Sequence, residues 1–220
     1  MANMTSSVSA SQVAGELASA TFEEIPALLE HYREDPRQQV IKACERALKR
    51  HAKELAERER VNDMYELMHE LGGDGVVVGV DEVGRGSVAG PLTVCAVCLP
   101  MEPRVWGIND SKKLTEKKRE ALFDEICEKA LAYRIVFVGP EVIDRENILH
   151  ATMGGMQQAV EELDIVPNLV LVDGNRTPAG LQIPAQPVVK GDATSASIGA
   201  ASVLAKVSRD RYMLELDKQY

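Results

Sequence analysis

Four acidic residues of this 220-residue chain stand at the ends of segments whose composition predicts β-strands. Asp81 and Glu82 follow the apolar run VVVGV, Asp173 closes LVLV, and Asp192 comes just after VVKG. In open α/β sheets, ligands bind beyond the carboxyl ends of the strands, so Asp81 and Asp173 would meet there if their strands are neighbours. Carboxylate oxygens without histidine or cysteine favour Mg²⁺ or Mn²⁺. Two such ions about 3.5–4 Å apart would suit the hydrolysis of a phosphodiester.

Each of these acids has a simpler alternative role as a turn former, because aspartate side chains readily bond to their own backbone. Acids that close several strands of one sheet favour the metal site over that alternative. The turn Gly84-Arg85-Gly86 opens the stretch GRGSVAG, which is close to a dinucleotide-binding fingerprint. That motif requires a helix directly after the turn, whereas Pro91 and a β-branched segment follow here. We therefore reject dinucleotide binding.

The elements that must position the acids alternate along the chain from Asp74 onward. Apolar runs predict strands at 76–80, 92–99, 134–139, 168–174 and 186–192. Amphipathic patterns predict helices over 114–133, over 141–163 as one helix or two, and over 194–220. This alternation predicts a mixed α/β sheet flanked by helices.

The N-terminal region has a different character. Residues 1–20 are rich in Ser and Ala and are expected to be disordered. Thr21 with Glu24 predicts a capping box and a short helix, and Asp35-Pro36 predicts a long helix that ends before Gly72-Gly73. The predicted domains are thus 1–20, a helical extension at 21–73, and a catalytic domain at 74–220. We interpret the extension as a solvated hairpin; the open alternative is a partner or nucleic-acid arm that uses Lys49, Arg50, Lys53, Arg58 and Arg60.

Composition restricts the class of protein. A hydrophobic fraction of 45% indicates a folded protein, and a net charge of −9 argues against a general basic nucleic-acid binder. The sequence shows neither a signal peptide nor an apolar run long enough to span a membrane, and it has four cysteines, so we expect a cytoplasmic protein. Cys95 and Cys98 form a CxxC spacing inside a predicted strand; they would point to opposite faces, and we expect both in the core.

Several motifs together resemble bacterial ribonuclease HII, from about Val78 to Tyr220. They are GVDEVGRG, AGP, NDSKKL, EKKREALF, VDGN, IPAQPVVKGD and AASVLAKVSRDRYM, in that order along the chain. The resemblance implies a ribonuclease H-like fold, with a five-stranded mixed sheet flanked by helices. It implies an endonuclease that cleaves RNA in RNA–DNA hybrids and single ribonucleotides embedded in duplex DNA, acts as a monomer, and leaves 3′-hydroxyl and 5′-phosphate ends. The cofactor would be two Mg²⁺ or Mn²⁺ ions.

The resemblance also assigns roles to residues of this chain. The metal-binding and catalytic acids would be Asp81, Glu82, Asp173 and Asp192, the same four that the strand ends indicate. The turn Gly84-Arg85-Gly86 would read the ribose 2′-hydroxyl, because glycine lets the backbone approach a sugar closely. The expected contacts to the nucleic-acid backbone are Ser111, Lys112, Lys113 and Lys206, with Lys190 and Arg209 as weaker candidates. Asp210 is a rival metal ligand, but its arginine neighbours favour a surface ion pair.

Three alternatives to an active ribonuclease HII remain open at this point. The family normally continues beyond the position of Tyr220, so the chain could be an inactive fragment that still binds metal or hybrid. It could instead act through residues 21–71 as an interaction protein. Ribonuclease HIII shares the fold, but its extension is expected to be β-rich, whereas this one is predicted to be helical.

Overall fold

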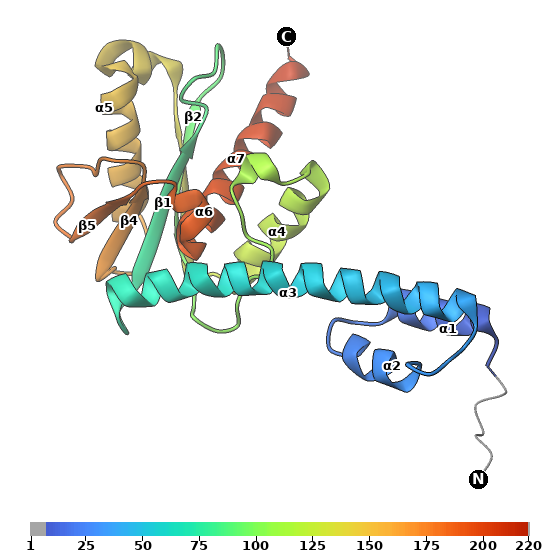
Figure 1. Cartoon of the computed structure of the whole chain (residues 1–220). Coiled ribbons are helices and arrows are strands. Elements are labelled where there is room, and N and C mark those ends of the chain that lie inside the picture. Colours follow the sequence, from blue (N-terminus) through green and yellow to red (C-terminus); the bar gives the residue numbers. More distant parts are fainter. Residues whose placement is uncertain (1–7, 220) are drawn as a thin grey trace. The chain divides into compact units, whose positions relative to one another are not determined.

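The computed structural model describes residues 8–219. The chain divides into two compact units, with the boundary between Arg60 and Val61 inside a long helix. None of the helices formed by residues 8–219 is both long and apolar enough to cross a membrane. The elements, most of which are labelled in Figure 1, are α1 (Ala10–Ser19), α2 (Ile25–His31), α3 (Gln38–Gly72), β1 (Val77–Val83), β2 (Leu92–Cys98), η1 (Ser111–Lys113), α4 (Glu116–Lys129), β3 (Ala132–Val138), α5 (Pro140–Glu161), β4 (Leu169–Asp173), β5 (Ala185–Val188), α6 (Gly191–Thr194) and α7 (Ala196–Asp217).

Helix α1 corrects the prediction that the N-terminus is disordered. Residues 10–19 are helical, while residues 1–7 lie outside the described structure. The helix begins with a capping box, in which Ser9 Oγ accepts from the Gln12 amide at 3.2 Å and Gln12 Oε1 accepts from the Ser9 amide at 2.8 Å. The Ser- and Ala-rich composition concealed an amphipathic pattern, whose buried positions Val13 and Leu17 lie four residues apart.

The two predicted helix starts that follow are found close to their expected places. The Glu24 carboxylate accepts a hydrogen bond from the Thr21 amide at 2.8 Å, as a capping box requires, but α2 itself begins only at Ile25. Helix α3 begins shortly after Pro36 and ends at Gly72, as the glycine pair predicted. The extension is therefore helical, as we expected.

Arg50 of α3 completes the packing of α1 within the first unit. Its guanidinium donates to the carbonyl oxygens of Leu17 at 3.1 Å and Ala20 at 2.7 Å. The last carbonyls of a helix have no partner within that helix, and a cationic donor is their best substitute. This contact gives Arg50 a structural role in the N-terminal unit.

The second unit is built on a five-stranded mixed sheet with the order β3-β2-β1-β4-β5. Strand β1 pairs antiparallel with β2 and parallel with β4. The register aligns Val80 with Val172, so the next residues, Asp81 and Asp173, come side by side. The structure thus confirms the mixed sheet and the neighbouring strands on which the predicted site depends. Strand β1 extends to Val83, so Asp81 and Glu82 lie inside the part of the strand that pairs with β2 and not beyond its end.

The sheet carries a separate hydrophobic core on each face. Helices α4 and α7 cover one face and helix α5 covers the other (Figure 1). Cys95 belongs to the first core and Cys98 to the second, which confirms the prediction that both cysteines are buried on opposite faces.

The end of α3 belongs to the first of these cores. Val61, Met64, Tyr65 and Met68 are each at most 2% exposed, and the Val105 amide donates to the Tyr65 hydroxyl at 2.9 Å. Burial raises the pKa of that hydroxyl to about 12. The predicted division between extension and catalytic domain at residue 73 therefore differs from the packing, in which residues 61–72 are part of the catalytic unit. Charged residues dominate most of α3, so its short apolar end gave no separate signal in the sequence.

Helix α5 is interrupted at Asn147, which has φ 66° and ψ 161°. The Asn147 side chain accepts from the amides of Leu149 and His150 at 3.0 and 3.1 Å and so caps the second half of the helix. Of the two readings that the sequence left open, two helices joined by a kink is the better description.

Helix α7 approaches β1 more closely than any side chain would allow. A Cβ atom at Gly79 would lie 2.2 Å from the backbone nitrogen of Ile198 and 2.2 Å from the carbonyl carbon of Ser197. Backbone atoms cannot yield as a flexible side chain can, so a glycine is required in the middle of β1.

We expect Gly79→Ala to destabilise the protein by about 1–3 kcal/mol or more, because the added methyl group forces β1 and α7 apart. Gly154→Ala is the matched control, since Gly154 is exposed in α5 and a Cβ there meets no atom within 4 Å. That change should be neutral or stabilise by about 0.4–1 kcal/mol. Urea unfolding of both variants measures the difference; equal stabilities would contradict the packing described here.

Candidate functional site

Asp81 is the most buried acid at the end of the sheet, with 5% of its surface exposed. Burial raises the pKa of its carboxyl well above the ordinary range, and the nearby Glu82 and Asp173 raise it further. A hydrogen bond from Ser202 of α7 and one from the Glu82 amide, at 2.7 Å, act in the opposite direction. The strand thus presents a carboxylate that is poorly solvated and lies near other negative charges. A bound cation would stabilise the charged form of this carboxylate.

Glu82 points away from Asp81, because successive residues of a strand face opposite sides of the sheet. Burial raises the pKa of the Glu82 carboxyl, and the Arg85 guanidinium, 3.6 Å away, lowers it. Asp173 raises the pKa of Glu82 as well as that of Asp81, so it lies within electrostatic reach of both.

Asp192 reaches the same region from α6. Its amide donates to Asp173 Oδ1 at 3.4 Å, and burial followed by the charge of Asp173 raises the pKa of its carboxyl. The chain turns into α6 through Lys190, a non-glycine residue in the left-handed conformation with φ 59° and ψ 36°. Such a conformation costs about 1–3 kcal/mol and is often kept where function requires it. The four predicted acids are therefore neighbours linked through Asp173.

The donor set suits Mg²⁺ or Mn²⁺, because every candidate ligand is a carboxylate oxygen. Within residues 8–219, no three His, Cys, Asp or Glu side chains are gathered closely enough to hold a metal ion as they stand. The alternation of β1 contributes to this spacing, since the side chains of Asp81 and Glu82 leave the strand on opposite faces. The assignment of the four acids as metal ligands stays a prediction.

The turn after β1 contains two glycines with different structural needs. Gly84 has φ +92°, and a Cβ there would lie 2.5 Å from Arg209 Nε, so the fold itself requires glycine. Gly86 is exposed, and a Cβ there would meet no protein atom within 4 Å. Nothing in the protein's own packing explains the second glycine.

The segment around η1 brings two lysines toward the acids. Lys112 and Lys113 are exposed, and both lower the pKa of Asp192, so their charges lie near it. Ser111 is only 2% exposed, and its hydroxyl is hydrogen-bonded to that of Ser202 at 3.0 Å. The structure therefore places the Ser111 side chain inside the protein, behind Asp81, and not on the surface where we expected it to contact a phosphate.

Two further basic candidates, Lys206 and Arg209, have partners within the protein. Lys206 Nζ lies 2.6 Å from Asp210 Oδ1, and Arg119 lies 3.9 Å from the other oxygen of that carboxylate. Asp210 thus forms ion pairs, as expected, but its partners are Lys206 and Arg119 and not the neighbouring arginines of α7. Arg209 is 8% exposed, and it donates to backbone carbonyls rather than facing solvent.

A cavity of about 340 Å³ lies beside the acids. Its polar wall includes two of the predicted acids and Arg85, and its apolar wall comes from the second half of α5. The sequence analysis missed several of its residues. Arg176, the basic residue directly after VDGN, could have been predicted from the sequence, whereas the α5 side chains reach the cavity only through the fold. The lining is Glu82, Arg85, Leu149, Met153, Met156, Asp173, Gly174, Asn175 and Arg176.

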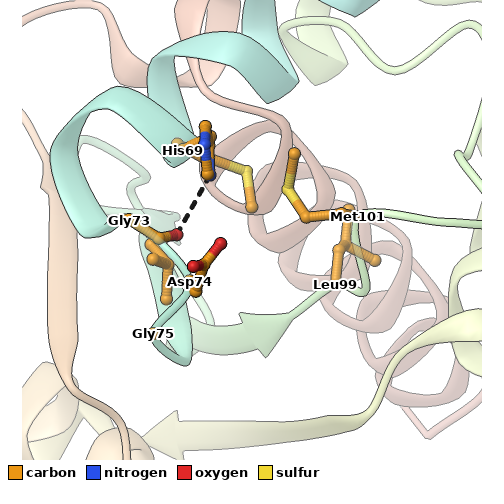
Figure 2. A pocket seen from close by; sticks show the side chains of 8 residues that line it. His69, Gly73, Asp74, Gly75, Leu99 and Met101 are labelled. Atoms are coloured by element: carbon orange, nitrogen blue, oxygen red, sulfur yellow. Dashed lines mark hydrogen bonds between the residues drawn. The ribbon is translucent and has the colours of Figure 1, made fainter.

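A smaller hollow of about 170 Å³, drawn in Figure 2, lies at the opposite end of β1. His69 and Met101 are among its lining residues, and the His69 ring is hydrogen-bonded to the Gly73 carbonyl at 3.2 Å. None of the acids considered above lines it. The candidate site is therefore the larger cavity and the acids beside it.

Comparison with known families matches both units of the chain. The family model described as Ribonuclease HII matches residues 78–220, and the one described as Ribonuclease HII N-terminal domain matches residues 9–71. The first of these ranges is the one over which the motifs suggested a resemblance.

Known proteins with similar sequences or folds agree with these matches. The Ribonuclease HII of Shewanella sp. (strain MR-7) is 56% identical over 150 residues, which cover 66% of this chain and 72% of that protein. The ribonuclease H2 of Pyrococcus horikoshii OT3 is similar in structure, with a TM-score of 0.60 and 31% identity over 66% of this chain and 76% of the other. The PCNA:RNase HII complex from Archaeoglobus fulgidus gives a TM-score of 0.57 at 27% identity, with coverage of 66% and 77%.

The raised pKa of Asp81 predicts that this carboxyl destabilises the metal-free protein at neutral pH. The folded state holds the proton more tightly than the unfolded state, so the free energy of unfolding falls as pH rises from about 4, the ordinary carboxyl pKa, toward the raised value. Asp81→Asn should therefore unfold at higher urea concentration than the wild type at pH 7 in EDTA, and this gain should shrink toward pH 4.

Asp164→Asn, at an exposed acid outside the site, controls for the exchange of a carboxylate for an amide. Denaturant titrations at several pH values provide the comparison. An Asp81→Asn variant that is no more stable than the wild type at pH 7 would contradict the unfavourable burial of this charge.

Proposed function

The chain belongs to the ribonuclease HII family, and we propose that it cleaves the RNA strand of RNA–DNA hybrids and single ribonucleotides embedded in duplex DNA. Membership makes it an endonuclease of the ribonuclease H type. Cleavage on the 5′ side of the ribonucleotide would leave 3′-hydroxyl and 5′-phosphate ends. The observation that carries the proposal is the parallel pairing of β1 with β4, which brings Asp81 and Asp173 side by side.

The residues that would hold divalent cations are Asp81, Glu82, Asp173 and Asp192. Their mutual electrostatic effects on the pKa values of Asp81, Glu82 and Asp192 support a shared cation-binding role. Two bound Mg²⁺ or Mn²⁺ ions would supply activation of the attacking water and stabilisation of the leaving 3′ oxygen. No side chain of the protein needs to act as a nucleophile.

The protein's own contribution is to orient these carboxylates and to limit their motion. Ser202 and the Glu82 amide hold the Asp81 carboxylate by hydrogen bonds, and Arg85 restrains the Glu82 carboxylate by a salt bridge. These bonds limit the directions in which the two carboxylates can move when a cation draws the acids together. We propose that the enzyme acts as a monomer in the cytoplasm.

The turn Gly84-Arg85-Gly86 is proposed to detect the ribose 2′-hydroxyl. A 2′-hydroxyl is what distinguishes RNA from DNA at a given position, and backbone amides can bond to it only at close range. The absence of any packing reason for Gly86 supports a role in which the missing side chain leaves room for the sugar.

Basic side chains near the acids would hold the nucleic-acid backbone. Lys112 and Lys113 are exposed and electrostatically coupled to Asp192, which supports a contact with a phosphate close to the cleaved bond. Lys206 could contribute only in part, because it is already paired with Asp210. Local cations of this kind allow a chain with a net charge of −9 to bind a polyanion.

The first test is cleavage of a DNA duplex that contains one ribonucleotide, with Mg²⁺, with Mn²⁺ and with EDTA. We expect a single cut 5′ to the ribonucleotide that requires the metal, and a loss of at least about 10²-fold in Asp81→Asn because a charged ligand is removed. Asp164→Asn is the control and should keep full activity. A folded wild-type chain that does not cut would overturn the proposal in favour of an inactive, metal- or hybrid-binding fragment.

The two glycines of the turn provide a second test. Gly86→Ala should leave the free energy of unfolding within about 0.5 kcal/mol of the wild type. It should nevertheless lower kcat/KM on the ribonucleotide duplex by about tenfold or more, a difference of about 1.4 kcal/mol in binding the reacting sugar. Gly84→Ala should lower stability as well, because its Cβ meets Arg209 and the Pro91 carbonyl. Full activity in Gly86→Ala would argue against close approach of the sugar at this turn.

A further inference from the structure

Arg209 of α7 is a buried arginine with an unusual set of partners. It is 8% exposed; its Nε donates to the Pro91 carbonyl at 2.9 Å and its Nη2 donates to the Ala89 carbonyl at 2.8 Å. No acidic side chain among residues 8–219 forms a salt bridge with it. Buried arginines are normally paired with a carboxylate, so this guanidinium is placed to hold backbone carbonyls.

The carbonyls that it holds belong to the loop between β1 and β2, residues 84–91. One backbone hydrogen bond lies within this loop, from the Ser87 amide to the Gly84 carbonyl at 3.1 Å, and Val88 at its tip is fully exposed. A loop with few contacts of its own would be mobile without an external anchor. Arg209 supplies two charge-assisted hydrogen bonds to its C-terminal half.

Two glycines of the loop lie close to the Arg209 side chain. Gly84 and Gly90 both have positive φ, +92° and +83°. A Cβ at Gly84 would lie 2.5 Å from Arg209 Nε, and one at Gly90 would lie 2.3 Å from Met213 Sδ and 3.3 Å from Arg209 Nη2. The guanidinium therefore occupies the space that a side chain at Gly84 would need, and it also lies close to the loop at Gly90.

The same helix also holds the acids. Ser202 of α7 bonds to Asp81, and Ser197 and Ile198 lie directly beneath Gly79 of β1. Ser202 and Arg209 are seven residues apart, which places them on the same side of the helix and about 10 Å apart along its axis. One rigid element thus fixes both the end of β1 and the turn that follows it.

From this arrangement we infer that Arg209 is a positioning residue, which holds the turn Gly84-Arg85-Gly86 at a fixed distance from the acids and thereby sets selectivity for a ribose over a deoxyribose. The inference rests on the proposed function, in which that turn reads the 2′-hydroxyl. Arg209 is not expected to contact the substrate itself, since its side chain is buried and its Nε and Nη2 are engaged within the protein. It is therefore withdrawn as a candidate phosphate contact.

The variants that test this inference are Arg209→Ala, Arg209→Lys and Arg211→Ala. Lysine keeps the charge and can reach one carbonyl, but it lacks the planar fork that bonds to two. Arg211 is the matched control, because it lies on the same helix and is half-exposed against Glu120. Thermal unfolding of all three establishes that each variant is folded.

The first measurement is amide hydrogen exchange of residues 84–91 without nucleic acid. We expect exchange in this loop to be about tenfold faster or more in Arg209→Ala, intermediate in Arg209→Lys and unchanged in Arg211→Ala, while β1 and β4 stay protected. Unchanged exchange in Arg209→Ala would overturn the claim that this side chain holds the loop.

The second measurement is selectivity, taken as the ratio of KM for a duplex with one ribonucleotide to Ki for the all-DNA duplex of the same sequence. In Arg209→Ala this ratio should move toward one, and kcat/KM should fall by about tenfold or more. A general loss of folded enzyme lowers kcat but leaves the ratio unchanged, so a wild-type ratio in this variant would overturn the role in selectivity. A wild-type chain that does not cleave would instead overturn the proposed function together with the selectivity claim, whereas the exchange experiment would still decide whether Arg209 holds the loop.

Discussion

The parallel pairing of β1 with β4 is the constraint on which the rest of the molecule depends. It aligns Val80 with Val172 and so forces two carboxylates to end side by side, although each of them would be better solvated apart. Helix α7 makes that pairing rigid, because its backbone lies against Gly79 with no side chain between them. The acids, the glycine turn and the cavity beside them all take their positions from these two contacts.

Groups around the site acids partly offset the negative charge of the carboxylates. Three of the four acids have a local group that lowers the pKa of the carboxyl: Arg85 acts on Glu82, Ser202 acts on Asp81, and Lys112 and Lys113 act on Asp192. These groups offset only part of the unfavourable burial, since the pKa values of all three carboxyls remain raised. In the function that we propose, a divalent cation would offset the remaining unfavourable charge.

Sequence reasoning recovered the features of this protein that are local. An acid that closes an apolar strand and two cysteines three apart in a strand are readable from neighbouring residues, and the structure bears out the strands behind both predictions. The features that the sequence did not predict depend on contacts between segments far apart in the chain. The buried place of Ser111 follows from its hydrogen bond to Ser202, 91 residues away, and the structural role of Arg209 follows from carbonyls about 120 residues away.

Helix α3 shows how a domain boundary can be invisible in a sequence and still constrain how a protein evolves. Its last three turns complete the core around Tyr65, whereas its beginning packs with α1 and α2. The seam between the two units is therefore a point within a continuous helix and not a loop. Recombination at that point would have to join two helical segments, since a break inside a helix removes the backbone hydrogen bonds that span it. No loop marks the end of the N-terminal unit, so it cannot be exchanged as a simple cassette.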